Sequence, residues 1–118
     1  GYYVQGRDLE DKNRILSEAK QLENAGAEII LLECVPASLA EEISSSLSIP
    51  TIGIGAGSAT DGQIMVCYDA IGAYIWDDQP QPKFVKNFMN ESNSIFEAFE
   101  KYVSEVKSLK FPSDDHSF

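Results

Sequence analysis

The sequence contains few of the residues that bind metals or nucleic acids. Its 118 residues include one histidine and two cysteines, Cys34 and Cys67, whose separation fits no zinc-ligand spacing. Nine basic residues against 19 acidic ones give a net charge of −10, which argues against nucleic acid and anionic membranes as partners. No apolar run approaches the roughly 18 residues of a membrane span, and no signal peptide is recognisable. We therefore expect a cytoplasmic protein whose cysteines are small core residues in a reducing compartment.

The chain alternates amphipathic helices with short apolar runs, within the length of one domain. Asp8 is a suitable N-cap for the first helix, and Gly26 a suitable C-cap. Pro36 can open the second helix. We predict helices over residues 8–25, 37–47 and 83–109, strands over 27–33, 51–57 and 63–69, and an irregular tail over 111–118.

This order of elements predicts a parallel α/β sheet. The strands are apolar throughout, which is typical of a parallel sheet covered by helices on both faces. Such units occur in (β/α)8 barrels and in open doubly wound sheets. Three strands cannot close a barrel, which needs eight strands and about 250 residues. If the fold is a barrel, residues 1–118 are its last part.

Glu33 is the main candidate for a functional residue. It ends the apolar run Ile29–Leu32, and a charge there is costly to dehydrate unless something requires it. One interpretation is a half-exposed carboxylate that caps the next turn or pairs with a lysine. The other is a general base, because parallel folds place their active sites at the carboxyl ends of strands. Burial against Leu32, Cys34 and Val35 would raise its pKa and favour that role.

The glycine-rich stretch "GIGAG" at 53–57 is a second candidate site. A dinucleotide fingerprint needs a third glycine at its next position and a following helix, but Ser58 stands there and a strand follows. Tight backbone packing is one alternative. We favour another, in which Gly53 and Gly55 leave room for a ligand to approach the backbone.

The remaining acidic residues and the histidine have weaker claims to function. Asp61 is interpreted as part of a turn. Asp69 is either a catalytic residue at a strand end or, equally well, a helix N-cap or a loop carboxylate. Asp77 and Asp78 lie in a polar loop and are expected to be solvated. His116 is interpreted as a tail residue, and the apolar stripe of the C-terminal helix as core or subunit interface.

Six segments together resemble a known enzyme family. "GYYVQGR", "LLECVP", "SIPTIGIGAG", "DGQIMVCYDAIG", "PKFVK" and "FPSDDHSF" match, in order and spacing, the C-terminal portion of ketopantoate hydroxymethyltransferase. The resemblance covers essentially all 118 residues. Because the long motifs recur at the right separations, the match is much more specific than a single short motif.

The resemblance implies a (β/α)8 TIM barrel of the phosphoenolpyruvate/pyruvate superfamily and a homo-oligomer. It implies transfer of a hydroxymethyl group from 5,10-methylenetetrahydrofolate to 3-methyl-2-oxobutanoate, giving 2-dehydropantoate in pantothenate and coenzyme A biosynthesis. The family's catalytic base falls on Glu33. Its Mg²⁺ ligands and the residues that bind the 2-oxo acid fall upstream of Gly1, so we expect no metal-binding or cofactor-binding residue in this chain.

The sequence also departs from the family pattern. Thr60 stands where cysteine is frequent, Phe88 where tyrosine is common, and the loop "YIWDDQPQ" at 74–81 replaces a glycine-containing loop. These changes leave the family resemblance intact, but they weaken the transfer of the family's folate-contacting residues to this sequence. We interpret residues 1–118 as the C-terminal segment of one barrel domain that lacks the N-terminal strands. Such a segment is expected to be inactive alone and to be covered by another copy or by the missing part.

Two other functions fit the residues less fully. The segment could be a non-catalytic oligomerisation or regulatory module that keeps the barrel's C-terminal helix, with Glu33 as a relic. It could also be a small α/β nucleotide-binding protein that uses the GIGAG loop. The missing third glycine and the missing helix weigh against the nucleotide-binding function.

Overall fold

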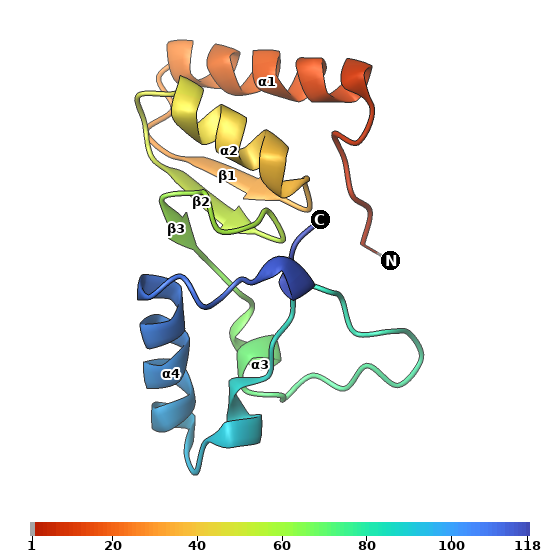
Figure 1. The fold of residues 1–118 in the computed structure, drawn as a ribbon, viewed down its shortest axis with the longest axis vertical. Coiled ribbons are helices and arrows are strands. Elements are labelled where there is room, and N and C mark those ends of the chain that lie inside the picture. Colours follow the sequence, from red (N-terminus) through yellow and green to blue (C-terminus); the bar gives the residue numbers. More distant parts are fainter. Residues whose placement is uncertain (1) are drawn as a thin grey trace.

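The computed structural model describes residues 2–118 and contains the predicted alternation of helices and parallel strands (Figure 1). The elements are α1 (Leu9–Asn24), β1 (Ile30–Glu33), α2 (Ala37–Ser46), β2 (Thr51–Ile54), β3 (Gly62–Gln63), α3 (Cys67–Ala70), η1 (Phe88–Glu91), α4 (Ile95–Lys107) and η2 (Asp114–His116).

The first helix begins and ends at the residues that its sequence predicts. The Asp8 carboxylate accepts a hydrogen bond from the Asp11 N–H at 2.8 Å, which caps α1. The Asp11 carboxylate in turn accepts one from the Gly6 N–H at 2.6 Å, so the N-terminal arm is tied to the first turn of α1. Gly26, with a φ of 103°, carries the chain out of the helix in the left-handed region.

The sheet has three parallel strands in the order β1-β2-β3. Leu32 of β1 lies opposite Gly53 of β2, and Gly53 lies opposite Gln63 of β3. All carboxyl ends of the strands therefore lie at one edge of the sheet, as the α/β prediction requires.

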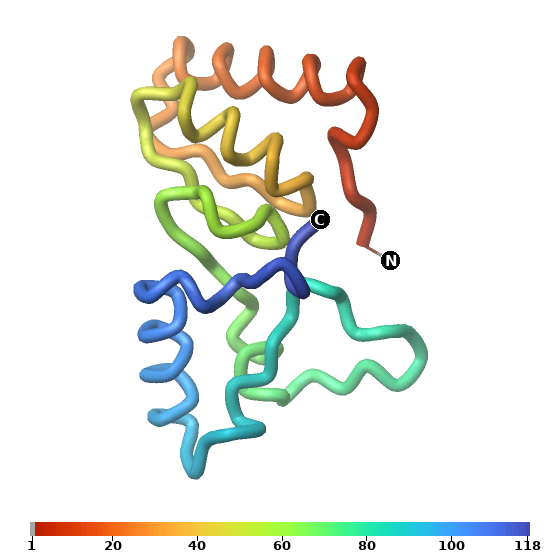
Figure 2. Tube along the Cα trace, viewed as in Figure 1, coloured from red at the N-terminus to blue at the C-terminus, as the bar shows by residue number. Residues whose placement is uncertain are grey.

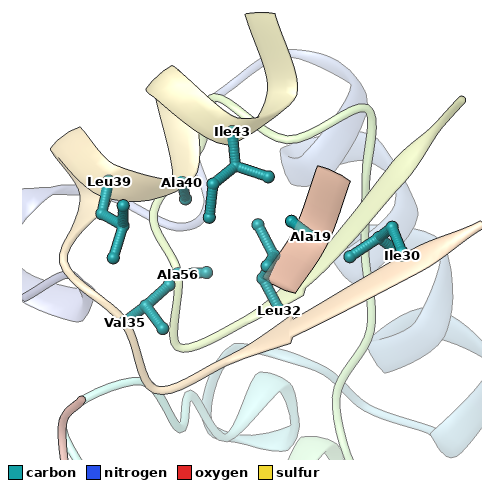
Figure 3. Close-up of a cluster of buried hydrophobic side chains, with 8 residues drawn as sticks. All are labelled: Ala19, Ile30, Leu32, Val35, Leu39, Ala40, Ile43 and Ala56. Carbon is teal, nitrogen blue, oxygen red and sulfur yellow. The ribbon is translucent and has the colours of Figure 1, made fainter. Parts of the chain in front are cut away.

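Helices α1 and α2 cover one face of this sheet (Figures 1 and 3). Leu39 and Ile43 of α2 are 1% and 0% exposed and pack over the alternate buried residues of β1. Complete burial of such a side chain contributes about 1.5–3 kcal/mol each. The buried cluster consists of Ala19, Ile30, Leu32, Val35, Leu39, Ala40, Ile43 and Ala56.

The opposite face of the sheet is open within residues 2–118. Ile29 and Leu31 are 58% and 53% exposed, because the alternation of β1 points them away from α1 and α2. The expectation of helices on both faces is therefore wrong for this part of the chain. Leu22 of α1 is also largely exposed.

The molecule is more extended than a closed domain of its length. Its radius of gyration is 15.1 Å, and its extents are 45 × 29 × 22 Å. A compact domain of this length would have a radius of gyration of about 13.5 Å. Figure 2 shows the reason: α1, α2 and the sheet form one end, and α3, η1 and α4 form the other. An open sheet and an elongated outline fit a protein that presents surface for further contacts.

The predicted strand 63–69 is wrong except at its first residue. Strand β3 ends at Gln63, and the chain turns at Val66 into the single helical turn α3, where the Asp69 N–H donates to the Val66 carbonyl at 3.0 Å. Cys67, expected in the core, is exposed, whereas Cys34 is buried as predicted. The alternating apolar residues before Asp69 resemble a strand in sequence, but Ile64 and Val66 are 46% and 47% exposed and lie beyond the end of β3.

The predicted helix 83–109 is also wrong in its first half. Helix α4 begins only at Ile95, where Ser94 caps it by accepting from the Glu97 N–H at 3.1 Å. Phe84 and Phe88 are nevertheless buried, 4% and 1% exposed, in a loop and in η1. Their apolar spacing therefore predicted correctly that both side chains are buried, but predicted wrongly that both belong to the C-terminal helix.

The C-terminal tail is more ordered than predicted. Residues 114–116 form η2, and Phe111 is buried against Phe88 at a ring-centroid distance of 5.4 Å. The last residue, Phe118, accepts a hydrogen bond at its carbonyl from the Ala37 N–H at 2.9 Å. The tail thus ends at the first turn of α2, beside the carboxyl ends of the strands.

Candidate functional site

Glu33 and the glycine-rich loop lie at the same end of the sheet, as predicted. Glu33 is the last residue of β1 and lies opposite Ile54, the last residue of β2. Immediately beyond, the Cys34 N–H donates to the Ile54 carbonyl at 3.0 Å and the Val35 N–H to the Gly55 carbonyl at 3.2 Å. Cys34 has a φ of 51°, an uncommon conformation for a non-glycine residue, so the chain turns sharply just after Glu33.

The expected burial of the Glu33 carboxyl is wrong. Leu32, Cys34 and Val35 are buried, but Glu33 is exposed. The alternation of the strand is the reason: Leu32 points toward α2, and Glu33 points to the open face with Leu31. The carboxylate is therefore accessible to a substrate that would bind at that face.

The N-terminal arm runs past this strand end. The Gln5 N–H donates to the Cys34 carbonyl at 3.0 Å. Tyr2 packs edge-on against Phe84 at a centroid distance of 5.1 Å. Partial burial and the negative charges of Asp69 and Glu33 raise the pKa of the Tyr2 phenol. Tyr2 is thus within electrostatic reach of both carboxylates and stays protonated at neutral pH.

A pocket of about 420 Å³ lies against this arm, beside α3. Asp69 is 6% exposed, and burial raises the pKa of its carboxyl group. Asp69 lies within α3, so the interpretation as a helix N-cap is wrong. The pocket is lined by Tyr2, Val66, Tyr68, Asp69, Tyr74, Trp76 and Gln79.

The aromatic lining is the part of the site that sequence reasoning missed. Tyr2 comes from the N-terminal arm, and Tyr74 and Trp76 come from the loop 74–81. The ring centroids of Tyr74 and Trp76 lie 4.5 Å apart. The clustering of aromatic residues in "GYY" and "YIW" was the available signal. Only the fold brings these two segments together.

The glycines of the GIGAG loop make room for protein side chains. A Cβ at Gly53 would lie 2.9 Å from the Thr60 hydroxyl, and one at Gly55 2.9 Å from the Phe84 ring. The interpretation that these glycines admit a ligand is therefore wrong. The loop leads into β3 and not into a helix, and Ala37, the first residue of α2, packs against Gly57 with its N–H donated to the Phe118 carbonyl, which counts against the nucleotide-binding alternative.

The other polar residues singled out in the sequence have local partners. The Asp61 carboxylate accepts from the Thr51 N–H at 2.8 Å, which fixes the loop to β2 and confirms a structural role. Asp77 and Asp78 are exposed, as predicted. The His116 ring bonds the Ser113 hydroxyl at 2.8 Å, and burial together with the nearby charge of Lys86 lowers its pKa.

Within residues 2–118, no cluster of three histidine, cysteine, aspartate or glutamate side chains could bind a metal ion. The same part of the chain has no helix with both the length and the apolar character to cross a membrane.

The fold and the site define a class of protein: an α/β protein with a parallel sheet and a carboxylate at the carboxyl end of a strand. The family model described as ketopantoate hydroxymethyltransferase matches residues 1–114. The chain therefore belongs to the ketopantoate hydroxymethyltransferase family.

Curated relatives agree with this assignment. A 3-methyl-2-oxobutanoate hydroxymethyltransferase of Shewanella sp. (strain ANA-3) is 50% identical over all of this chain, which covers 44% of that protein. A homologue with the same name from Chromobacterium violaceum is also 50% identical, with 44% covered. A probable enzyme of this kind from Schizosaccharomyces pombe is 48% identical, with 43% covered. The chain thus spans less than half the length of these relatives.

Proposed function

We propose that this chain supplies the general base of a 3-methyl-2-oxobutanoate hydroxymethyltransferase. The reaction takes a one-carbon unit from 5,10-methylenetetrahydrofolate and attaches it to 3-methyl-2-oxobutanoate, giving 2-dehydropantoate. The observation that carries the proposal is the position of Glu33, exposed at the carboxyl end of β1 in a chain of this family.

The chemistry assigned to Glu33 is proton abstraction. Its carboxylate would take the proton from the carbon next to the 2-oxo group, and the electron pair left there would form the bond to the one-carbon unit. Both carbon–nitrogen bonds to the folate break and water supplies the hydroxyl group of the product, while tetrahydrofolate leaves with the proton taken by Glu33 and one proton from the water. An exposed carboxylate with no hydrogen-bond partner among residues 2–118 is free to approach such a substrate.

Magnesium belongs to the proposal only as a requirement of the whole enzyme. Residues 2–118 offer no set of three acidic, histidine or cysteine ligands, so we assign the ion to no residue of this chain and derive no step through it. The 2-oxo acid would bind mainly through groups outside the described part.

The open face of the sheet supports a barrel. Leu31 and Ile52 lie opposite each other on adjacent strands, on the same side as Glu33. In a (β/α)8 barrel this side would be the packed interior, which accounts for apolar residues that residues 2–118 leave uncovered. We propose that further strands, from the rest of the enzyme or another copy, complete it in a cytoplasmic homo-oligomer.

The test is complementation. We expect residues 1–118 alone to have no magnesium-dependent transfer activity, and co-expression with the N-terminal part of the Shewanella relative to restore it. The Glu33→Gln variant of the assembly should lose activity. Deuterium exchange at the carbon next to the 2-oxo group should disappear with it.

Two results would contradict the proposal. Turnover by residues 1–118 alone would show that the missing groups are not needed. A folded assembly without activity would favour the second candidate, a non-catalytic oligomerisation module, which the exposed Leu31 and Ile29 also suit.

A further inference from the structure

Asp69 is a buried carboxylate without a partner. It is 6% exposed, and among residues 2–118 no side chain or backbone N–H donates to its carboxylate oxygens. No polar atom that is fully shielded from solvent lacks a partner in this part of the chain, so the Asp69 oxygens must reach the pocket space. A carboxylate held out of bulk water in this way favours a ligand that brings hydrogen-bond donors.

The pocket around Asp69 selects the shape and charge of that ligand. Tyr2, Tyr68 and Tyr74 are 51–62% exposed, and their rings offer flat apolar surface. No lysine or arginine lines the pocket, so an anionic group such as the carboxylate of a 2-oxo acid would find no counter-charge. A flat, neutral, donor-bearing heterocycle suits it.

We propose that Asp69 binds the pterin ring of the folate co-substrate, accepting paired hydrogen bonds from its 2-amino group and N3–H while aromatic side chains contact the ring faces. This inference rests on the proposed function, since the folate is the co-substrate of that reaction. The adjacent amino and ring N–H groups of a pterin form a donor fork like that of a guanidinium, which a carboxylate accepts with two parallel bonds.

The position of the pocket suits delivery of the one-carbon unit. Tyr2 lines the pocket and lies on the arm that bonds Cys34, the residue after Glu33. The pocket volume of about 420 Å³ lies within the roughly 300–1,000 Å³ of small-molecule sites.

A neighbouring pocket of about 500 Å³ offers room for the folate tail. It shares Tyr2 and Gln79 with the first pocket, and its lining includes Arg7 and Lys83 together with Asp8 and Asp11, whose carboxylates already accept from the Asp11 and Gly6 N–H groups. These cations can meet the carboxylates of the glutamate tail, which a pterin alone lacks. The two pockets therefore divide the co-substrate into a neutral ring beside Asp69 and an anionic tail beside Lys83.

Calorimetric titration tests the proposal. Residues 1–118 and the complemented assembly are each titrated with tetrahydrofolate and with tetrahydropterin, which lacks the tail. Asp69→Asn should weaken binding of both ligands by roughly tenfold to a hundredfold, because the amide puts a donor where the ring also donates. Lys83→Met should weaken tetrahydrofolate alone. Emission of Trp76, the only tryptophan in the sequence, should change on binding and locate the ligand.

The matched control is Asp78→Asn, which makes the same charge change on an exposed loop residue outside the pocket lining. It should bind both ligands like the unmodified chain. A ligand-side control compares 6-methylpterin with 6-methyllumazine, which has an oxygen in place of the 2-amino group. The unmodified protein should prefer the pterin, and Asp69→Asn should lose that preference whatever its effect on stability.

Equal binding by the Asp69→Asn variant and the unmodified protein, or no binding to either the chain or the assembly, overturns the inference. Deuterium exchange into the 2-oxo acid separates this failure from failure of the proposed function, because exchange needs Glu33 but no folate. Exchange that persists in Asp69→Asn, with a raised KM for the folate only, supports both ideas. Exchange that does not depend on Glu33 contradicts the proposed function alone.

Discussion

The two faces of the sheet differ in how far other residues of the chain cover them. On the helix-covered face, Leu39, Ala40 and Ile43 are almost fully buried, and local sequence signals place α1 and α2 there. On the open face, Leu31 is half exposed and Glu33 is accessible. The first face provides stability, whereas the second exposes Glu33, the proposed general base, to solvent.

The largest expected effect falls on the open face. In the complemented assembly, Glu33→Gln should lower the transfer rate by about 10²–10⁴-fold, the usual contribution of a general base. In residues 1–118 alone it should leave the free energy of unfolding nearly unchanged, because Glu33 is exposed there. Steady-state kinetics and urea unfolding measure the two quantities. Glu28→Gln, at another exposed glutamate, should change neither, and an equal loss in both variants would remove the special role of Glu33.

The covered face should respond in the opposite way. Ile43→Ala should reduce the free energy of unfolding by about 2–5 kcal/mol, because it leaves a cavity among fully buried neighbours. Leu31→Ala should cost under about 1 kcal/mol in the chain alone, because that side chain is already half exposed. Urea unfolding at constant pH compares them.

The same two variants, Ile43→Ala and Leu31→Ala, also test the barrel proposal. In the complemented assembly the cost of Leu31→Ala should rise toward that of Ile43→Ala, because the open face would be covered. An unchanged cost in the assembly would mean that Leu31 stays in solvent, which contradicts a barrel interior on this side.

The packing of Gly55 in the loop 53–57 can be tested against Gly26, which also has a positive φ but lies at the end of α1 in open space. Gly26→Ala should cost about 1–2 kcal/mol for the left-handed backbone alone, since a Cβ there meets nothing within 4 Å. Gly55→Ala should cost about 1–3 kcal/mol more, because its Cβ would press on Phe84. Thermal or urea unfolding of both variants checks the order, and a Gly55→Ala variant as stable as Gly26→Ala would contradict the packing.

The smallest effect concerns the pH dependence of stability. The pKa of Asp69 is raised above its ordinary 3.8 by burial, so the folded chain binds more protons than the unfolded chain between the two values. Its contribution to stability is therefore present at low pH and is lost as pH rises through the raised pKa. Asp69→Asn should remove this slope and raise the unfolding free energy at pH 7 by about 1 kcal/mol. Asp78→Asn, measured across the same pH series, should keep the slope.

Strong local signals made the first half of the fold predictable. The Asp8 cap, the Gly26 turn and the apolar run before Glu33 each act within a few residues, so their reading did not depend on distant contacts. The position of Glu33 at the end of β1 follows from the same pattern. Its exposure did not follow, because a run of apolar residues conceals which of them face a covering helix.

The second half was harder to predict because its apolar residues serve long-range contacts. Phe84 lies against Tyr2, and Phe88 against Phe111, in loop and 3₁₀ segments whose spacing resembles a helix. Periodicity reports that a residue is buried but does not report by which segment. The aromatic pocket beside Asp69 was missed for the same reason.

The sequence alone determined the α/β class, the first two helices, the strand that ends at Glu33 and the family, because these depend on local caps, periodicity and long motifs. Tertiary structure decided that Glu33 faces the open side and that Tyr2 and Trp76 enclose Asp69 with loop 74–81. The contact of Tyr2 with the pocket around Asp69 joins segments more than 60 residues apart, and only the folded chain brings such segments together.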